Sequence, residues 1–256
     1  MIFVEIIKFK KDKGNTYKVY FSDDTIISLH DDVIVKYNLL TNKKLDNDKF
    51  NEIVNYNDFL NGYYKSIKYI NKKMRSEVEI ENYLKKLEIK KEERNKIIKL
   101  LYKDGYLNRE VYVKAFINDK YNLSNDGPIK IKKDLINLGY KESEFLSYLN
   151  SLDWYFRIDK QVDKKIKLNH KLSTNALKTK ILNELIKLGY EKNDIINILE
   201  SKDFDDDYLF LEKELIKIKL KYSKKYKDNE LYYKVVNYLF NKGFNLEDIK
   251  RCYDEN

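Results

Sequence analysis

The sequence predicts a mainly α-helical protein, in which tandem three-helix repeats form an elongated curved array after a small N-terminal antiparallel β-meander. Only 7 of the 256 residues are Gly and one is Pro, which disfavours the frequent turns of a β-sandwich or barrel. Strand-like runs are confined to the N-terminal region, and one helix-ending pattern recurs along the rest of the chain. The 43% of hydrophobic residues is enough to bury a sizeable core.

The N-terminal region, residues 1–50, carries the strand signals. Runs of β-branched and aromatic residues at 2–9, 17–21 and 25–29 are separated by KKDKGN and SDD, which are typical of turns. Consecutive strands joined by short turns predict an antiparallel meander. The stretches that follow, DDVIVKYNLL and DKFNEIVNYNDFLNGYYKSIKYI, have the apolar period of helices.

The recurring pattern ends at four anchor positions. Glu88, Gly139, Gly189 and Gly243 follow one another at intervals of 51, 50 and 54 residues. Apolar residues precede the anchors at the spacing i, i+4 and i+7, which places them on one face of a helix, although Lys242 breaks the pattern before the last anchor. Glycine tolerates the left-handed backbone that ends a helix in a Schellman motif, so each glycine predicts a helix end. Glu88 in the same conformation should cost about 1 kcal/mol.

Helix starts are marked as well. Ser76 and Glu79 form the pattern of a capping box, Pro128 suits a first helical turn, and Ser173 is an N-cap candidate. Each unit therefore holds a leading helix, a capped middle helix that ends at the anchor, and a short third helix. We predict four such repeats, which span residues 51–107, 108–152, 153–203 and 204–256.

No catalytic, cofactor or metal site is predicted. Nucleotide-binding and hydrolase motifs are absent, Cys252 has no cysteine partner, and His30 and His170 lie far apart without a motif around them. The acidic run at 205–207 starts a predicted helix, where the helix dipole favours negative charge. Trp154 and the tyrosines are expected to pack in the core. A cytoplasmic protein is expected, because no window has the length of a membrane span and the N-terminal apolar run is too short for a signal peptide.

Positive charge is unevenly distributed along the chain. The net charge is +9, but residues 1–55 carry nine Lys against nine Asp and Glu, so the excess lies after residue 55. An AT-rich coding bias alone would yield many lysines, and a solvated helix face is the alternative explanation for any one of them. Three local clusters are nevertheless candidate partner contacts. They comprise Lys72, Lys73 and Arg75; Lys130 and Lys133; and Lys164 and Lys165.

Three segments in a fixed order resemble a known family. They read KSIKYINKKMRSEVEIENYLKK, LLYKDGYLNREVYVKAFIND and GPIKIKKDLINLGY, and the second contains the turn GYLN at 105–108. Together they resemble the RecX family of bacterial RecA regulators. Arg109 departs from the pattern of that family, which has an acidic residue there. The resemblance is strongest over 59–152 and continues in register over 153–256.

The resemblance implies binding without catalysis. RecX-like proteins lie along the groove of the RecA filament on single-stranded DNA and suppress its ATP hydrolysis, strand exchange and co-protease activity, which places them in DNA repair, homologous recombination and the SOS response. We therefore expect a monomer whose partners are the RecA filament and single- or double-stranded DNA, with no membrane partner and no cofactor. Two other classes stay open: a sequence-tolerant nucleic-acid-binding helical repeat protein, whose affinity would fall steeply with salt, and a helical protein-interaction scaffold, which would bind neither RecA nor DNA.

Overall fold

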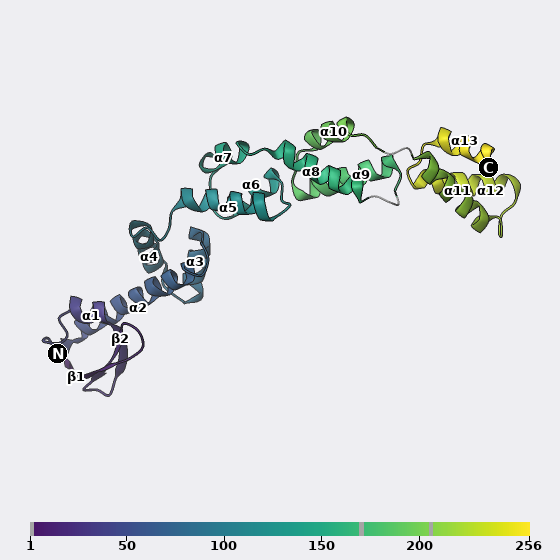
Figure 1. Ribbon diagram of the computed structural model, residues 1–256. Coiled ribbons are helices and arrows are strands. Elements are labelled where there is room, and N and C mark those ends of the chain that lie inside the picture. The colour runs from purple at the N-terminus through teal and green to yellow at the C-terminus, as the bar shows by residue number, and fades with distance from the viewer. Residues whose placement is uncertain (1–2, 169–171, 205–206) are drawn as a thin grey trace. The chain divides into compact units, whose positions relative to one another are not determined.

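The structure is a computed structural model that describes residues 3–168, 172–204 and 207–256. It confirms the predicted fold class, because the chain is mainly helical and begins with an antiparallel β-sheet (Figure 1). The chain divides into two compact units, Met1–Val113 and Lys114–Asn256. No helix within the described residues is long and apolar enough to cross a membrane.

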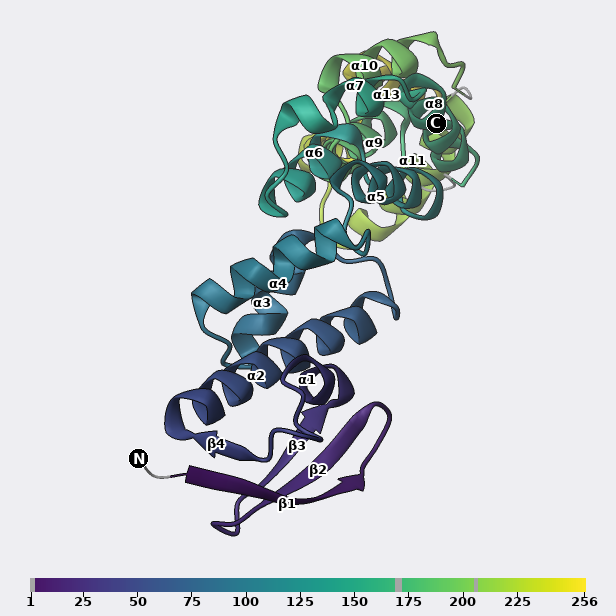
Figure 2. The same cartoon turned by 90° about the vertical axis from the view of Figure 1, so that its left-hand side faces the viewer.

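A four-stranded antiparallel sheet opens the first unit (Figure 2). Its strands are β1 (Phe3–Lys11), β2 (Thr16–Phe21), β3 (Ile26–His30) and β4 (Lys44–Asp46), in the spatial order β3-β2-β1-β4. The first three confirm the predicted meander. The short β4 is absent from the sequence prediction because its three residues carry no pattern of their own. It is fixed instead by pairing with the start of β1, where Val4 lies opposite Leu45.

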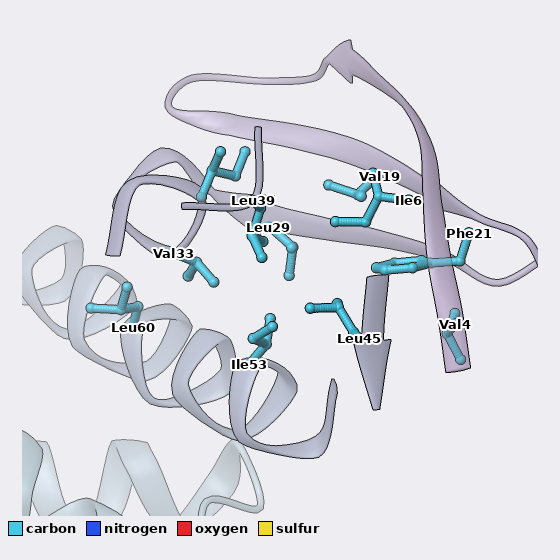
Figure 3. Close-up of a cluster of buried hydrophobic side chains, with 11 residues drawn as sticks. Val4, Ile6, Val19, Phe21, Leu29, Val33, Leu39, Leu45, Ile53 and Leu60 are labelled. Atoms are coloured by element: carbon cyan, nitrogen blue, oxygen red, sulfur yellow. The ribbon is translucent and has the colours of Figure 1, made fainter. Parts of the chain in front are cut away.

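One face of the sheet is buried beneath two helices, α1 (Asp31–Lys36) and α2 (Asn47–Ile70). Successive residues of a strand point to opposite faces, so every second side chain enters this core, and Val19 is fully buried there. Figure 3 shows side chains of the strands and of α2, among them Ile53 and Leu60, meeting in one apolar cluster. Among the described residues of this unit, no helix packs on the other face of the sheet.

Helix α2 serves two cores. Ile53 and Leu60 pack under the sheet, while Tyr63 belongs to the apolar cluster of the next helices. Asp46 accepts a 2.7 Å hydrogen bond from the Lys49 N–H and so caps the start of α2. The boundary predicted after residue 50 therefore falls inside one continuous helix, and the ranges given for the N-terminal region and the repeats stay predictions.

The remaining helices come in threes, each with a leading, a middle and a third helix. After α2 come α3 (Glu77–Lys86) and α4 (Lys91–Lys103). The second set is α5 (Arg109–Leu123), α6 (Pro128–Asn137) and α7 (Leu146–Asn150), with the 3-10 turn η1 (Glu142–Glu144) before α7. The third is α8 (Trp154–Lys167), α9 (Thr174–Leu188) and α10 (Lys192–Ser201), and the fourth is α11 (Tyr208–Tyr222), α12 (Asp228–Asn241) and α13 (Leu246–Glu255).

The predicted ends of the middle helices are confirmed. After α9, the Tyr190 N–H donates to the Leu185 carbonyl at 3.1 Å, which is the long hydrogen bond of a Schellman motif. Glu88 adopts the same left-handed conformation after α3, with φ of +60°. The three anchor glycines have φ of +83° at Gly139, +91° at Gly189 and +91° at Gly243.

The predicted helix starts are confirmed too. The Ser76 hydroxyl accepts from the Glu79 N–H at 3.2 Å, and the Glu79 carboxylate accepts from the Ser76 N–H at 2.8 Å, which completes the capping box. Pro128 is the first residue of α6. Ser173 caps α9 by accepting from the Ala176 N–H at 3.3 Å.

Separate apolar cores lie within the first, third and fourth sets of helices. In the third set, Ile181 and Leu185 of α9 meet Ile158 and Val162 of α8 and Ile195 of α10, all of them almost fully buried. Truncation of one such side chain to Ala costs about 2–5 kcal/mol. Each of these sets thus encloses apolar residues of its own, as the periodic pattern predicts.

Three residues singled out in the sequence have different outcomes. Trp154 packs as expected, edge-on against Tyr121 with ring centroids 5.1 Å apart. Asp207 is the N-cap residue of α11, as expected, but its carboxylate caps a different helix: it accepts from the Thr174 N–H at the start of α9, at 2.7 Å. His170 and the first two residues of the acidic run lie outside the described residues.

Candidate interaction surfaces

The middle helices of the second and third sets are joined end to end. The Gly127 N–H, at the start of α6, donates to the Leu188 carbonyl at 2.7 Å, and the Ile129 N–H donates to the Gly189 carbonyl at 3.0 Å. The first N–H groups and the last carbonyls of a helix have no partner within it. At this joint the two helix ends supply partners to each other, and their dipoles align favourably.

The third and fourth sets are joined in the same way. The Ser173 hydroxyl, at the start of α9, donates to the Lys242 carbonyl at 3.0 Å, just beyond the end of α12. The same hydroxyl accepts from the Ala176 N–H, so one side chain caps its own helix and binds the next one. Both joints lie within the second unit and use equivalent positions of successive repeats.

The joints give the anchor glycines a second role. A methyl group on Gly189 would lie 2.7 Å from the backbone N and from Cβ of Lys130, and one on Gly243 would lie 2.7 Å from the Ser173 hydroxyl oxygen. Glycine is therefore required both for the left-handed backbone and for the close approach of the preceding repeat. The sequence pattern predicts only the first requirement.

The first anchor, Glu88, has no neighbouring repeat packed closely against it. Within the described residues, no helix start from another repeat is hydrogen-bonded at the end of α3, where Glu88 stands. A cavity of about 490 Å³ lies there instead, lined among others by Glu88, Ile89 and, on α2, Asn61 and Gly62. A side chain at this anchor meets no neighbouring backbone, so only the strain of its positive φ remains.

A buried polar cluster flanks the joint between α6 and α9. The Tyr190 hydroxyl oxygen accepts from Arg157 Nε at 3.0 Å and from Gln161 Nε2 at 2.7 Å. The Arg157 guanidinium also donates to the Ser124 carbonyl and stacks over Tyr121, 4.8 Å from the ring centre. Tyr190 is 1% exposed, and burial raises the pKa of its hydroxyl. Arg157 thus connects Tyr190 of its own repeat to Tyr121 and Ser124 of the preceding repeat.

Asp126 is the charged centre beside this cluster. Its carboxylate accepts from Lys120 Nζ and from Lys130 Nζ, each at 2.7 Å, and Lys120 also lies 3.2 Å from Asp134. Burial by itself would raise the pKa of Asp126, but the hydrogen bonds from the two lysines outweigh it, and the pKa is lowered. Lys130 therefore neutralises a buried carboxylate just before the start of α6.

Three of the seven candidate contact residues hold ion pairs. Besides Lys130, Arg75 binds Glu79 with a 3.0 Å distance between Nη1 and Oε1, and its guanidinium lies 3.9 Å from the centre of the Tyr69 ring. Lys165 is paired with Glu184. These side chains stabilise the surface on which they lie, and a partner would have to compete with the internal acid.

The other four candidates are exposed, and within the described residues they form no ion pair. They are Lys72, Lys73, Lys133 and Lys164. The first two share the loop between α2 and α3 in the first unit, whereas the others stand on α6 and α8 of the second unit. Sequence position alone does not distinguish these four lysines from the three paired residues. The partner of Lys165, for example, is Glu184 on another helix, α9.

The histidine and the cysteine that the structure describes, whose side chains are the types most often used in catalysis, are both buried. His30 is buried, and its Nε2 lies 2.9 Å from Asn61 Oδ1. Cys252 is fully buried, and burial raises the pKa of its thiol. Among the described residues, no group of three or more His, Cys, Asp or Glu is placed to hold a metal ion.

Comparison with known proteins then assigns the chain. No family model matches it. Over 267 aligned residues, which cover 98% of this chain and 99% of the relative, it is 31% identical to the regulatory protein RecX of Streptococcus agalactiae. The chain belongs to the RecX family. The RecX of Lactococcus lactis is also 31% identical, over 90% of this chain and 88% of its own, and that of Staphylococcus aureus is 26% identical over 97% and 94%.

Solved RecX structures share the fold. A crystal structure of regulatory protein RecX aligns with a TM-score of 0.65 at 18% identity, covering 78% of this chain and 100% of its own. The crystal structure of RecX from Lactobacillus salivarius gives a TM-score of 0.52 at 22% identity, over 56% of this chain and 95% of its own. The sequence similarity to RecX of Streptococcus agalactiae covers 98% of this chain, so the aligned region includes most of the residues of the N-terminal sheet.

Proposed function

We propose that the protein is a non-enzymatic regulator that binds the RecA nucleoprotein filament along its groove and inhibits RecA's ATPase, strand exchange and co-protease activities. The observation that carries the proposal is the similarity, over nearly the whole chain, to proteins named regulatory protein RecX. In keeping with this role, we propose that the protein acts in the cytoplasm as a monomer, in DNA repair, homologous recombination and the SOS response.

The repeated construction supports a repeating partner. Successive middle helices are joined through equivalent positions, Gly127 to Leu188 and Ser173 to Lys242, so the same three-helix unit recurs along the chain. Several weak contacts of equivalent kind add up when they are tethered, because each raises the effective concentration of the next. A filament of identical subunits is a partner that can use such a series.

The exposed, unpaired lysines are the contact residues that we favour. A partner reaches Lys72, Lys73, Lys133 and Lys164 without breaking an ion pair of the described residues, whereas contact with Lys130 would expose the charge of Asp126. Substitution of Lys130 would thus confound loss of binding with loss of stability. Lys133 and Lys164 give a cleaner test.

The decisive measurement is ATP hydrolysis by RecA on single-stranded DNA as this protein is added. We expect the rate to fall in a dose-dependent way, and an unchanged rate at saturating protein would refute the proposal. The double variant Lys133→Glu/Lys164→Glu should inhibit less well. Its matched control is Lys224→Glu/Lys225→Glu, which makes the same change in charge at exposed residues after α11 and should inhibit normally.

A further inference from the structure

The outer face of the N-terminal sheet carries three exposed lysines, although the N-terminal region has no net charge. Helix α2 lies on one side of this sheet (Figure 2). Residues 1–55 are electrically neutral by count, yet the pairing of strands brings Lys8, Lys10 and Lys18 together on the opposite face. All three are exposed, and none forms an ion pair within the described residues. Most acids of the region lie elsewhere, in the turn after β2 and in or beside the helices: Asp23, Asp24, Asp31, Asp32, Asp46 and Asp48.

The register arranges this face in two rows of three side chains, one from each of β1, β2 and β3. One row holds a cation, a ring and an apolar group, and the other holds two cations and a hydroxyl. The rows are Lys8, Tyr20 and Ile26, followed by Lys10, Lys18 and Ser28. Two acids lie beside the rows. Glu5 precedes Lys8 on β1, and Asp12 accepts a 2.9 Å hydrogen bond from the Ser28 hydroxyl.

Two features of the rows are costly for a free surface. Lys10 lies directly opposite Lys18, and like charges in that position destabilise a sheet. Ile26, at the end of the other row, leaves 56% of its surface in water. Both costs are relieved by a ligand that is negatively charged and also offers flat apolar surface.

We propose that this face binds single-stranded nucleic acid. Lys10 and Lys18 would contact phosphates of the backbone, and Tyr20 would stack on a base, as in binders that combine a basic surface with exposed rings. Lys8 Nζ now lies 4.5 Å from the centre of the Tyr20 ring. It can move from the ring to a phosphate, which uncovers the ring for the base. An acidic peptide would satisfy the lysines but not the ring and Ile26.

The test is fluorescence anisotropy with a labelled oligothymidylate and the full chain, without RecA, so that its outcome is independent of the proposed regulation. Lys10→Gln/Lys18→Gln should weaken binding about tenfold and reduce the slope of log affinity against log salt by about 1.4, since each phosphate contact on a single strand contributes about 0.7. The control Lys99→Gln/Lys103→Gln removes the same charge from exposed positions of α4 and should change neither quantity.

The role of the ring is tested separately. Tyr20→Leu should weaken binding to the oligothymidylate several-fold while Tyr20→Phe keeps it, and neither change should affect binding to a duplex, whose base faces are covered. Circular dichroism checks that each variant is folded. Equal binding by the Lys10/Lys18 variant and the α4 control would overturn the proposal, and so would binding of polyglutamate but not of the oligonucleotide.

Discussion

The Gly127 N–H donates a 2.7 Å hydrogen bond to the carbonyl of Leu188, which joins the middle helices of two successive repeats. The two groups lie far apart in the sequence, yet both belong to helix ends that would otherwise leave backbone groups without partners. The stability of the second unit should therefore depend on the small residues at these ends. Four predictions test how the joints and their surroundings work.

Gly189→Ala should be far more damaging than the same change at another left-handed glycine. The methyl group would meet the Lys130 backbone at 2.7 Å in addition to the strain of a φ of +91°, for a total cost of about 2–5 kcal/mol. Gly105→Ala is the matched control, because Gly105 has φ of +78° with no atom within 4 Å of the added carbon, and it should cost about 1 kcal/mol. Urea unfolding of the two variants measures the difference. Equal costs would show that the joint does not constrain Gly189.

Glu88→Gly should stabilise the first unit. Removing a side chain from a backbone with φ of +60° relieves about 1 kcal/mol of strain, part of which is offset by the greater freedom of glycine in the unfolded chain. Lys85→Gly, one turn earlier on the exposed side of α3, should instead destabilise by about 1 kcal/mol. Thermal unfolding should move in opposite directions for the two variants, and a lower melting temperature for Glu88→Gly would contradict the explanation.

Tyr190→Phe should lower stability even though it removes only one oxygen atom. The change leaves Arg157 Nε and Gln161 Nε2 without their acceptor at a partly buried site, at a cost of about 1–3 kcal/mol. Tyr155→Phe serves as the control, since Tyr155 is 52% exposed and its hydroxyl can bond to water. Urea unfolding should separate the two variants. No loss in Tyr190→Phe would mean that water replaces the missing oxygen.

The contribution of Asp126 should depend on pH. Its pKa in the folded protein is lowered from the ordinary value of 3.8, because Lys120 and Lys130 outweigh the effect of burial. A carboxyl whose pKa falls on folding adds stability above its unfolded pKa and loses it as the pH drops through its folded pKa. The difference in free energy of unfolding between the natural protein and Asp126→Asn should therefore be constant near neutral pH and shrink below 3.8. A difference that persists in strong acid would indicate that geometry and not charge is responsible.

Local features could be predicted from the sequence because they depend on neighbours in the chain. The capping box of Ser76 and Glu79 and the helix end at Gly139 each follow from a few consecutive residues, and both occur as predicted. Strand β4 could not be predicted, since its place depends on β1, which lies far earlier in the chain. Asp207 shows the same limit: its place at the start of α11 could be predicted, but the hydrogen bond from its carboxylate to the Thr174 N–H of α9 could not.

The candidate contacts show what a linear reading of charge omits. Lys165 and Lys133 look alike in sequence, but within the described residues only Lys165 of the two has an acidic partner, Glu184 on α9. The N-terminal sheet shows the converse. The net charge of residues 1–55 is zero, yet Lys10 and Lys18 lie side by side on one face. Successive side chains of a strand point to opposite faces, so the alternation within each strand, and not the sum over the region, decides the charge of a face.

The joints also restrict which residues can stand at the helix ends that form them. Each joint admits only small groups on its two sides, with Gly127 or Ser173 at the start of a helix, and Gly189 or Gly243 at an end. The start of α12 and the end of α3 differ from these positions, because Lys227 precedes α12 and Glu88 follows α3. Neither position has the small residue that a joint of this kind requires.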